Sequence, residues 1–204
     1  DGYTLLFAAD APITIVPALV SKLSYDPVRD LAPISIVTQG GFVVLVHPSL
    51  PVKNIPELIA LVKSQPGKYS FASSGSGGQQ HLIFELIKTL AGLDMVHVPY
   101  KGFGQSLADV LANQVPMLVG GVTASIELIR SGKLRGIGFT APTRSPQLPD
   151  IAPVADTLPG FDIQAWYGFM APAGTPPEII RKIHADVVSI VRTPAILERM
   201  KKDA

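Results

Sequence analysis

A run of serine and glycine residues, Ser73 to Gly78, is the part of the sequence whose residue types and spacing point most clearly to chemistry. It follows a short β-prone run, Tyr69 to Ala72, and precedes a helical pattern with apolar residues on one face. This order leaves the first N–H groups of the helix without partners, in front of the positive end of the helix dipole. Such groups form an anion site, although a tight turn that binds nothing fits the loop equally well.

The serines of this loop add hydroxyl groups, and its glycines let a ligand approach the backbone closely. The first residues of the following helix lie beside the same backbone groups. From this stretch we predict the following ligand-binding residues: Ser73, Ser74, Gly75, Ser76, Gly77, Gly78, Gln79 and His81.

Two further loops stand at the ends of the next predicted strands, and ligands of an open parallel sheet bind beyond the carboxyl ends of its strands. The first holds Tyr100, Lys101 and Gly102, and the second holds Gly121 and Thr123. Lys101 would supply a cation and Tyr100 a hydroxyl group or an aromatic wall. Simple exposure would also explain Lys101, and a helix N-cap would explain Thr123. Three such loops at consecutive strand ends favour a binding site over turn formation alone.

Catalytic motifs fit the serine-glycine loop poorly. No Gly-Lys-Ser/Thr follows the glycines, the third glycine of a dinucleotide fingerprint is missing, and Ser74 replaces the first glycine of a nucleophile elbow around Ser76. The four histidines show no metal-ligand spacing. We therefore expect no catalytic residue, no metal and no cofactor. The alternative is a serine-dependent or phosphate-handling enzyme that uses Ser74 or Ser76.

The elements that must position these loops follow a regular order. Strand runs alternate with helical patterns between residues 42 and 140, and one helix begins with a capping box at Asn54. This alternation predicts βαβ units and a mostly parallel sheet. Two β-rich runs, 34–38 and 42–47, are predicted as separate strands divided by a Gly-Gly pair. The proline-rich segment 140–160 is predicted to run over the surface.

The two flanks of this region are too short to bury a core by themselves. We therefore predict that residues 1–41 and 162–204 form one lobe, and that 42–161 form a second lobe inserted between them. The predicted fold class is α/β, with two lobes joined by a hinge and with mostly parallel sheets.

The composition supports a buried core and shows no bias towards charged partners. Of 204 residues, 47% are apolar and 16% charged, and the net charge is +1. Such a balance gives no strong field for nucleic acid or a membrane surface. The absence of cysteine excludes disulfides and a thiol nucleophile within the chain. We find no apolar run of membrane-spanning length, and no signal-peptide pattern where the sequence opens at Asp1-Gly-Tyr3.

Short motifs spread over nearly the whole chain resemble those of one protein family. They include Tyr25-Asp-Pro27, Pro48-Ser-Leu-Pro-Val-Lys53, Ala72-Ser-Ser-Gly-Ser-Gly77, His97-Val-Pro-Tyr-Lys-Gly102 and Trp166-Tyr-Gly168. Together they resemble the Bug-type receptors, which are the periplasmic substrate-binding components of tripartite tricarboxylate transporters.

The resemblance implies a two-lobe, type II binding protein that closes like a clamshell on a small carboxylate. The ligand would be a dicarboxylate, a tricarboxylate, an aromatic acid or an acidic amino acid, held by backbone amides and waters. The resemblance further implies a periplasmic location and delivery of the ligand to membrane permease subunits. It implies no catalysis, no nucleic-acid partner and no insertion of the receptor itself into the membrane.

The chain also departs from the family pattern. It begins at the family's third strand, without the portion that carries a second carboxylate-gripping loop, and it stops before the family's C-terminal end. Asp10 stands where relatives tend to have small neutral residues. It would repel a second carboxylate or pair with a ligand amine if it faces the ligand, and otherwise lies outside the site.

Overall fold

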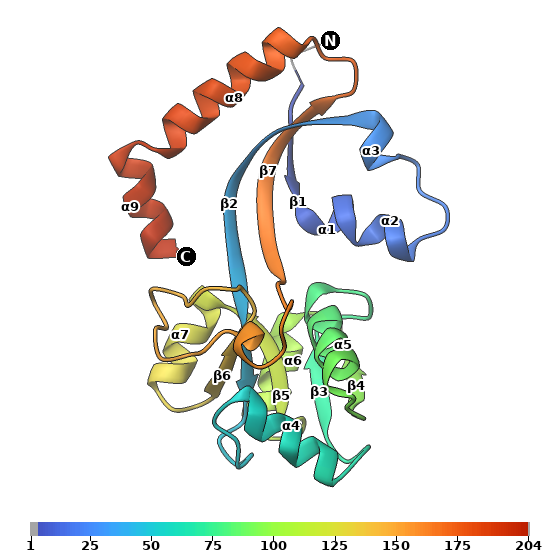
Figure 1. The fold of residues 1–204 in the computed structure, drawn as a ribbon, viewed down its shortest axis with the longest axis vertical. Helices are drawn as coiled ribbons and strands as arrows, with labels where there is room; N and C mark the ends of the chain where they lie inside the picture. Colours follow the sequence, from blue (N-terminus) through green and yellow to red (C-terminus); the bar gives the residue numbers. More distant parts are fainter. Residues whose placement is uncertain (1–3, 204) are drawn as a thin grey trace. The chain divides into compact units, whose positions relative to one another are not determined.

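The computed structural model describes residues 4–203, and the side chains up to residue 200. The chain divides into two compact units. Unit 1 comprises residues 1–40 and 165–204, and unit 2 comprises residues 41–164. Figure 1 shows the elements of both units along the chain.

Unit 1 combines a few long strands with peripheral helices. Strand β1 pairs antiparallel with β7, and β7 is next to β2 in the sheet. Helix α8 is tied to β2, because the His184 Nδ1 atom lies 2.8 Å from the Ile34 carbonyl oxygen. The elements are β1 (Leu6–Ala9), α1 (Asp10–Thr14), α2 (Val16–Leu19), α3 (Pro27–Asp30), the first part of β2 (Leu31–Val46), β7 (Gln164–Pro172), α8 (Pro177–Val191) and α9 (Pro194–Asp203).

Unit 2 is built on a five-stranded sheet in the order β6-β2-β5-β3-β4. Strand β3 runs parallel to both β4 and β5, whereas β2 runs antiparallel to β5 and β6. The elements after β2 are α4 (Ile55–Ser64), β3 (Ser70–Ser73), α5 (Gln79–Ala91), β4 (Val96–Pro99), α6 (Phe103–Leu111), β5 (Met117–Gly121), α7 (Val122–Arg130), β6 (Arg135–Phe139) and the 3₁₀ turn η1 (Val154–Asp156).

Strand β2 bears on two expectations. In unit 2 it runs antiparallel to both of its neighbours, so the predicted parallel arrangement holds for the other four strands, β3, β4, β5 and β6, whereas β1 and β7 of unit 1 pair antiparallel. The prediction of separate strands on the two sides of the Gly-Gly pair is wrong, since β2 continues through it from Leu31 to Val46. A Cβ on Gly41 would lie 2.7 Å from the Phe139 ring and 2.9 Å from the Ala141 nitrogen. This glycine therefore serves close packing and does not end a strand.

The segment 140–160 does not simply run over the surface, as the sequence suggested. Thr140 and Val154 are fully buried, and Leu148, Ile151 and Leu158 are at most 8% exposed. Val154 and Leu158 join one face of the core of unit 2, and Leu148 and Ile151 join the other. The prolines of the segment set its turns, while the apolar residues between them decide where it packs.

The core of unit 2 has two layers, because alternate residues of a strand point to opposite faces. Val44 and Val46 of β2 pack with α4 and α5 on one face, and Val43 and Leu45 pack with α6 and α7 on the other. The sheet is thus covered by helices on both faces, as the lower part of Figure 1 shows. This sandwich holds the strand ends and the helix starts in fixed positions.

The capping box at the start of α4 is confirmed. The Glu57 N–H donates to the Asn54 Oδ1 at 2.9 Å, and the Glu57 carboxylate accepts from the Lys53 N–H at 2.7 Å. The carboxylate thus reaches one residue beyond the usual partner in such a box. Helix α4 thus begins with a side-chain cap on its Glu57 N–H.

Candidate functional site

Three helices of unit 2 begin at one edge of its sheet. Because β3 is parallel to β4 and β5, the carboxyl ends of these strands meet there, and each leads into a helix. The N-cap residues of α5, α6 and α7 are Gly78, Gly102 and Gly121, and none of these helices has a side-chain cap hydrogen bond. The positive ends of the three helix dipoles therefore meet at this edge, which is the arrangement of an anion site.

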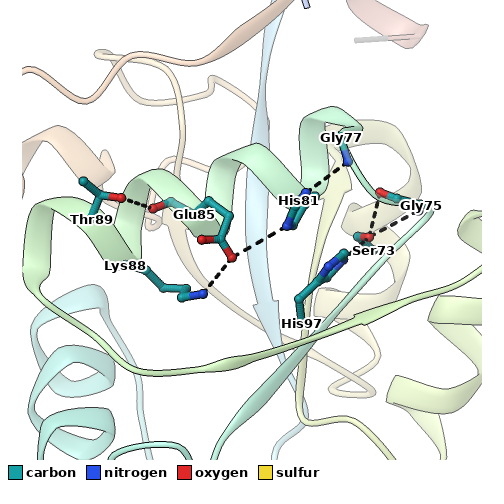
Figure 2. Close-up of polar contacts among 8 residues, drawn as sticks. All are labelled: Ser73, Gly75, Gly77, His81, Glu85, Lys88, Thr89 and His97. Carbon is teal, nitrogen blue, oxygen red and sulfur yellow. Dashed lines mark hydrogen bonds and ion pairs between the residues drawn. The ribbon is translucent and has the colours of Figure 1, made fainter. Parts of the chain in front are cut away.

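The β3–α5 loop is held by the last residue of its strand (Figure 2). The Ser73 side chain is buried, at 1% exposure, and its Oγ lies 2.6 Å from the His97 Nε2. The same Oγ donates to the Gly75 carbonyl at 3.0 Å and accepts from the Gly75 N–H at 3.2 Å. Ser73 therefore supports the loop from beneath, and its direct contact with a ligand stays a prediction.

Gln80, which the sequence analysis did not select, connects this loop to strand β5. Its Oε1 accepts from the Ser74 N–H at 2.8 Å, and its Nε2 donates to the Val119 carbonyl of β5 at 2.9 Å. No local pattern announces this role, since the two partners are brought to Gln80 by the fold of the sheet. Gln80 fixes the loop relative to the start of α7.

His81 holds the other end of the loop. Its Nδ1 accepts from the Gly77 N–H at 3.0 Å, and its ring stacks on that of His97 with centroids 3.9 Å apart. The His97 ring also stacks on Phe71, at 5.0 Å. Burial, followed by the positive charge that His81 can carry, lowers the pKa of His97. Figure 2 shows the two rings side by side beneath the loop.

These contacts leave one amide of the loop available. The N–H groups of Ser74, Gly75 and Gly77 are bound as described, and that of Gly78 donates to the Gly75 carbonyl at 3.4 Å. In the part of the chain that the structure describes, the Ser76 N–H has no partner, and the Ser76 side chain is exposed. An anion at this loop would therefore meet Ser76 and the first turn of α5.

The β4–α6 loop lies against the first loop, since the Tyr100 N–H donates to the Ser73 carbonyl at 3.0 Å. The Tyr100 hydroxyl donates to the Asp109 carboxylate at 2.6 Å, and this bond raises the pKa of Tyr100 to about 12. Because that hydroxyl is engaged within unit 2, Lys101 is the exposed side chain of the loop. Gly102 caps α6 beside it.

The β5–α7 loop presents bare backbone. A Cβ added to Gly121 would meet nothing within 4 Å, whereas one on Gly120 would lie 2.8 Å from the Ser125 Oγ. Thr123 is exposed within α7 and is not its N-cap, because the helix begins one residue earlier, at Val122. Gly121 is thus the residue of this loop that faces open space.

Asp10 belongs to a different unit from the other candidate residues. It is the first residue of α1 in unit 1 and is 7% exposed, whereas the loops after β3, β4 and β5 belong to unit 2. Thirteen of the fourteen candidates thus lie in unit 2, and Asp10 lies in unit 1.

The loop does not have the contacts of a nucleophile. The serine in contact with an imidazole is Ser73, which is 1% exposed, while the hydroxyls of Ser74 and Ser76 have no such partner among the described residues. Across residues 4–203 we find no group of three metal-binding side chains. The same residues contain no helix with the length and hydropathy needed to cross a bilayer.

The whole chain, residues 1–204, matches the family described as "Tripartite tricarboxylate transporter family receptor". The chain belongs to this family. Solved structures support the assignment. The periplasmic binding protein BugD is 30% identical, with a TM-score of 0.79, and the match covers 99% of this chain and 69% of that one.

Two similar structures contain ligands. MatC of Rhodopseudomonas palustris, solved with malate, is 29% identical with a TM-score of 0.77, and the match covers 99% of this chain and 69% of that one. Rpa4515 of R. palustris, solved with adipate, is 28% identical with a TM-score of 0.80, covering 96% and 66%. The chain therefore has the α/β fold of two-lobe periplasmic binding proteins, and its family consists of receptors and not of enzymes.

The match covers only part of each relative. Curated relatives that are 30% and 33% identical to this chain match it over 60% and 61% of their own length. The chain thus spans about three fifths of the length of these relatives.

Proposed function

We propose that this chain is part of a periplasmic receptor that binds a small dicarboxylate and delivers it to the membrane subunits of a tripartite tricarboxylate transporter. The observation that carries the proposal is the convergence of three glycine-capped helix starts in unit 2. Its membership of the receptor family supports this, as do the related structures solved with malate and adipate, which are both dicarboxylates. Units 1 and 2 would be the lobes that close on the ligand.

A carboxylate suits these helix starts physically. Its oxygens accept hydrogen bonds from several N–H groups at once, and bonds to a charged acceptor are roughly twice as strong as neutral ones. Each helix adds the positive end of its dipole. A site made of backbone needs no excess of basic side chains, which agrees with a net charge of +1. Lys101, exposed on the β4–α6 loop, is the candidate partner for a second carboxylate.

Calorimetric titration with malate, adipate, a tricarboxylate and a monocarboxylate of similar size tests the proposal. We expect the dicarboxylates to bind and the monocarboxylate to bind more weakly, because it lacks the second charge. Equal affinity for the mono- and dicarboxylate, or no binding of any of them, would contradict the proposal.

A matched pair of variants locates the site. Ser76→Asp places a carboxylate beside the available amide, and we expect it to weaken dicarboxylate binding by about tenfold or more, since like charges a few Å apart repel strongly near a protein surface. Gln114→Glu adds the same charge at the other edge of the sheet, where Gln114 is exposed just before β5. We expect Gln114→Glu to bind as the unchanged protein does, and equal losses in both variants would remove the site from this edge.

A further inference from the structure

His81 occupies an unusual position, because it supports the candidate loop with the one type of ring that changes charge between about pH 5 and 8. The Gly77 N–H donates to its Nδ1 at 3.0 Å. That nitrogen must therefore carry a lone pair, and the neutral ring carries its hydrogen on Nε2. The loop geometry thus corresponds to one tautomer of one protonation state.

A second proton on the ring would break this contact. The proton would go to Nδ1, where it would point at the Gly77 N–H, and two donors cannot bond to each other. Gly77 has φ +79°, which glycine adopts readily, but glycine can adopt many other conformations as well. Contacts such as the bond to His81 therefore select the present form of the loop. Loss of the bond frees the segment next to Ser76, whose amide is the available donor of the loop.

The charged groups around His81 come from two elements. Glu85 on α5 has its Oε1 3.7 Å from the His81 Nε2, and the same oxygen accepts from the Lys88 ammonium at 2.7 Å. From β4, the His97 ring stacks on His81, and β3 contributes only Phe71, which has no charge, at 6.3 Å. The pKa of His97 is lowered chiefly by burial, so this ring remains neutral over more of the acid range.

These neighbours decide the sign of the effect on an anion. A proton on His81 adds a positive charge, which by itself would attract a carboxylate. Glu85 lies beside the ring, but its Oε1 is already paired with the Lys88 ammonium, so it offsets only part of that charge. The broken Gly77 bond acts on the loop directly, and we expect its loss to be the larger effect.

We propose that His81 is a positioning residue whose neutral ring holds the β3–α5 loop in its binding form, so that the receptor binds its carboxylate less tightly as the ring becomes protonated. This inference rests on the proposed function of the same loop. Its consequence is a receptor that holds its ligand while the His81 ring is neutral and loosens it when the ring is protonated.

Two substitutions of His81 separate the acceptor from the charge. Asn places an amide oxygen near the position of Nδ1, whereas Gln places one near Nε2, and neither titrates. We expect the unchanged protein to bind malate or adipate about tenfold less tightly at pH 5.5 than at pH 8, the factor that one ordinary hydrogen bond contributes. His81→Asn should bind the acid nearly as tightly as the unchanged protein does, with little pH dependence. Because Asn does not titrate, any pH dependence that remains in this variant measures the effect of ligand protonation. His81→Gln should bind about tenfold more weakly at both pH values.

The contact itself is measured without ligand. In the ¹H–¹⁵N spectrum of the free protein, the Gly77 amide should shift with the same midpoint as the His81 ring carbons, and its hydrogen exchange should accelerate below that midpoint. A Gly77 amide that ignores the titration of His81, or an affinity that rises on acidification, would overturn the inference. If no acid binds at any pH while the Gly77 amide still shifts with the titration of His81, the proposed function fails, but the proton-dependent contact between His81 and Gly77 stands.

Discussion

The start of α4 and the starts of α5, α6 and α7 are built in opposite ways within the same unit. Helix α4 has a side-chain cap, because the Glu57 N–H donates to the Asn54 Oδ1. The other three helices begin at glycines and have no side-chain cap. The two kinds of helix start also lie at opposite edges of the sheet, because β2 leads towards α4 and runs antiparallel to β5, and thus also to β3 and β4. One edge uses side chains to cap its helix, and the other presents three helix starts without such caps.

The glycines follow the same division. A Cβ on Gly138 would lie 2.7 Å from Ile55, the first residue of α4, while one on Gly121 would meet nothing within 4 Å. The first glycine exists because a side chain would collide with the core, and the second leaves room for something outside the chain. The same residue type therefore has a packing role within the sheet, at Gly138, and a proposed binding role at its carboxyl edge, at Gly121.

The largest effect should come from Gly138→Ala. Its new methyl group would overlap Ile55 and approach Val154 at 3.0 Å, so we expect the free energy of unfolding to fall by about 1–3 kcal/mol. Urea unfolding followed by circular dichroism measures this. Gly121→Ala is the matched control and should unfold as the original protein does. A similar loss in both variants would remove the distinction between the two kinds of glycine.

Gly121→Asp should give α7 the side-chain cap that it lacks. The N-cap backbone, with φ −65° and ψ 154°, accepts Asp, whose carboxylate would cap α7 in place of a ligand. We expect dicarboxylate affinity to fall by about tenfold or more, while the free energy of unfolding rises by about 0.3–1 kcal/mol. Calorimetry and urea unfolding on the same samples measure both. Gly121→Asn caps without the charge and should cost less affinity, and an Asp variant with undiminished affinity would argue against a ligand at α7.

Asn54→Ala should remove the side-chain cap of α4, with the smallest effect of the three substitutions. Loss of its bond to the Glu57 N–H should lower the free energy of unfolding by about 1 kcal/mol. Carboxylate affinity, measured well below the unfolding temperature, should stay the same. A carboxylate affinity that falls together with the free energy of unfolding would show that the two edges of the sheet are not independent.

The sequence predicted most of the local elements of unit 2 because their signals are local. The capping box at Asn54 and the helix α5 need only neighbours a few residues away, and both appear where expected. The buried face of α5 is shifted from the predicted one, because Ile83, Phe84, Ile87 and Ala91 are buried while Leu90 is 46% exposed. The position of the candidate loop between β3 and α5 follows from the same kind of signal. Within these elements, spacing along the chain already determines which groups can meet.

Long-range pairing was not predictable in the same way. Strand β2 continues through Gly40 and Gly41 because it pairs with β7 as well as with β5 and β6, which all lie far along the chain. The segment 140–160 is pulled into the core by Leu148, Val154 and similar residues. A glycine pair and a proline-rich run usually end elements, but here tertiary contacts outweigh that weak local preference.

The candidate site divides along the same line. From the sequence alone come the serine-glycine loop, the helix behind it and the absence of a catalytic motif. Only the tertiary structure shows that Gln80 joins the loop to Val119, that Ser73 supports the loop through His97, and that His97 stacks on His81. The physical reason is that a helix dipole and its first N–H groups belong to one continuous segment, whereas the side chains that fix a loop bond to whatever partners the sheet brings within about 3 Å.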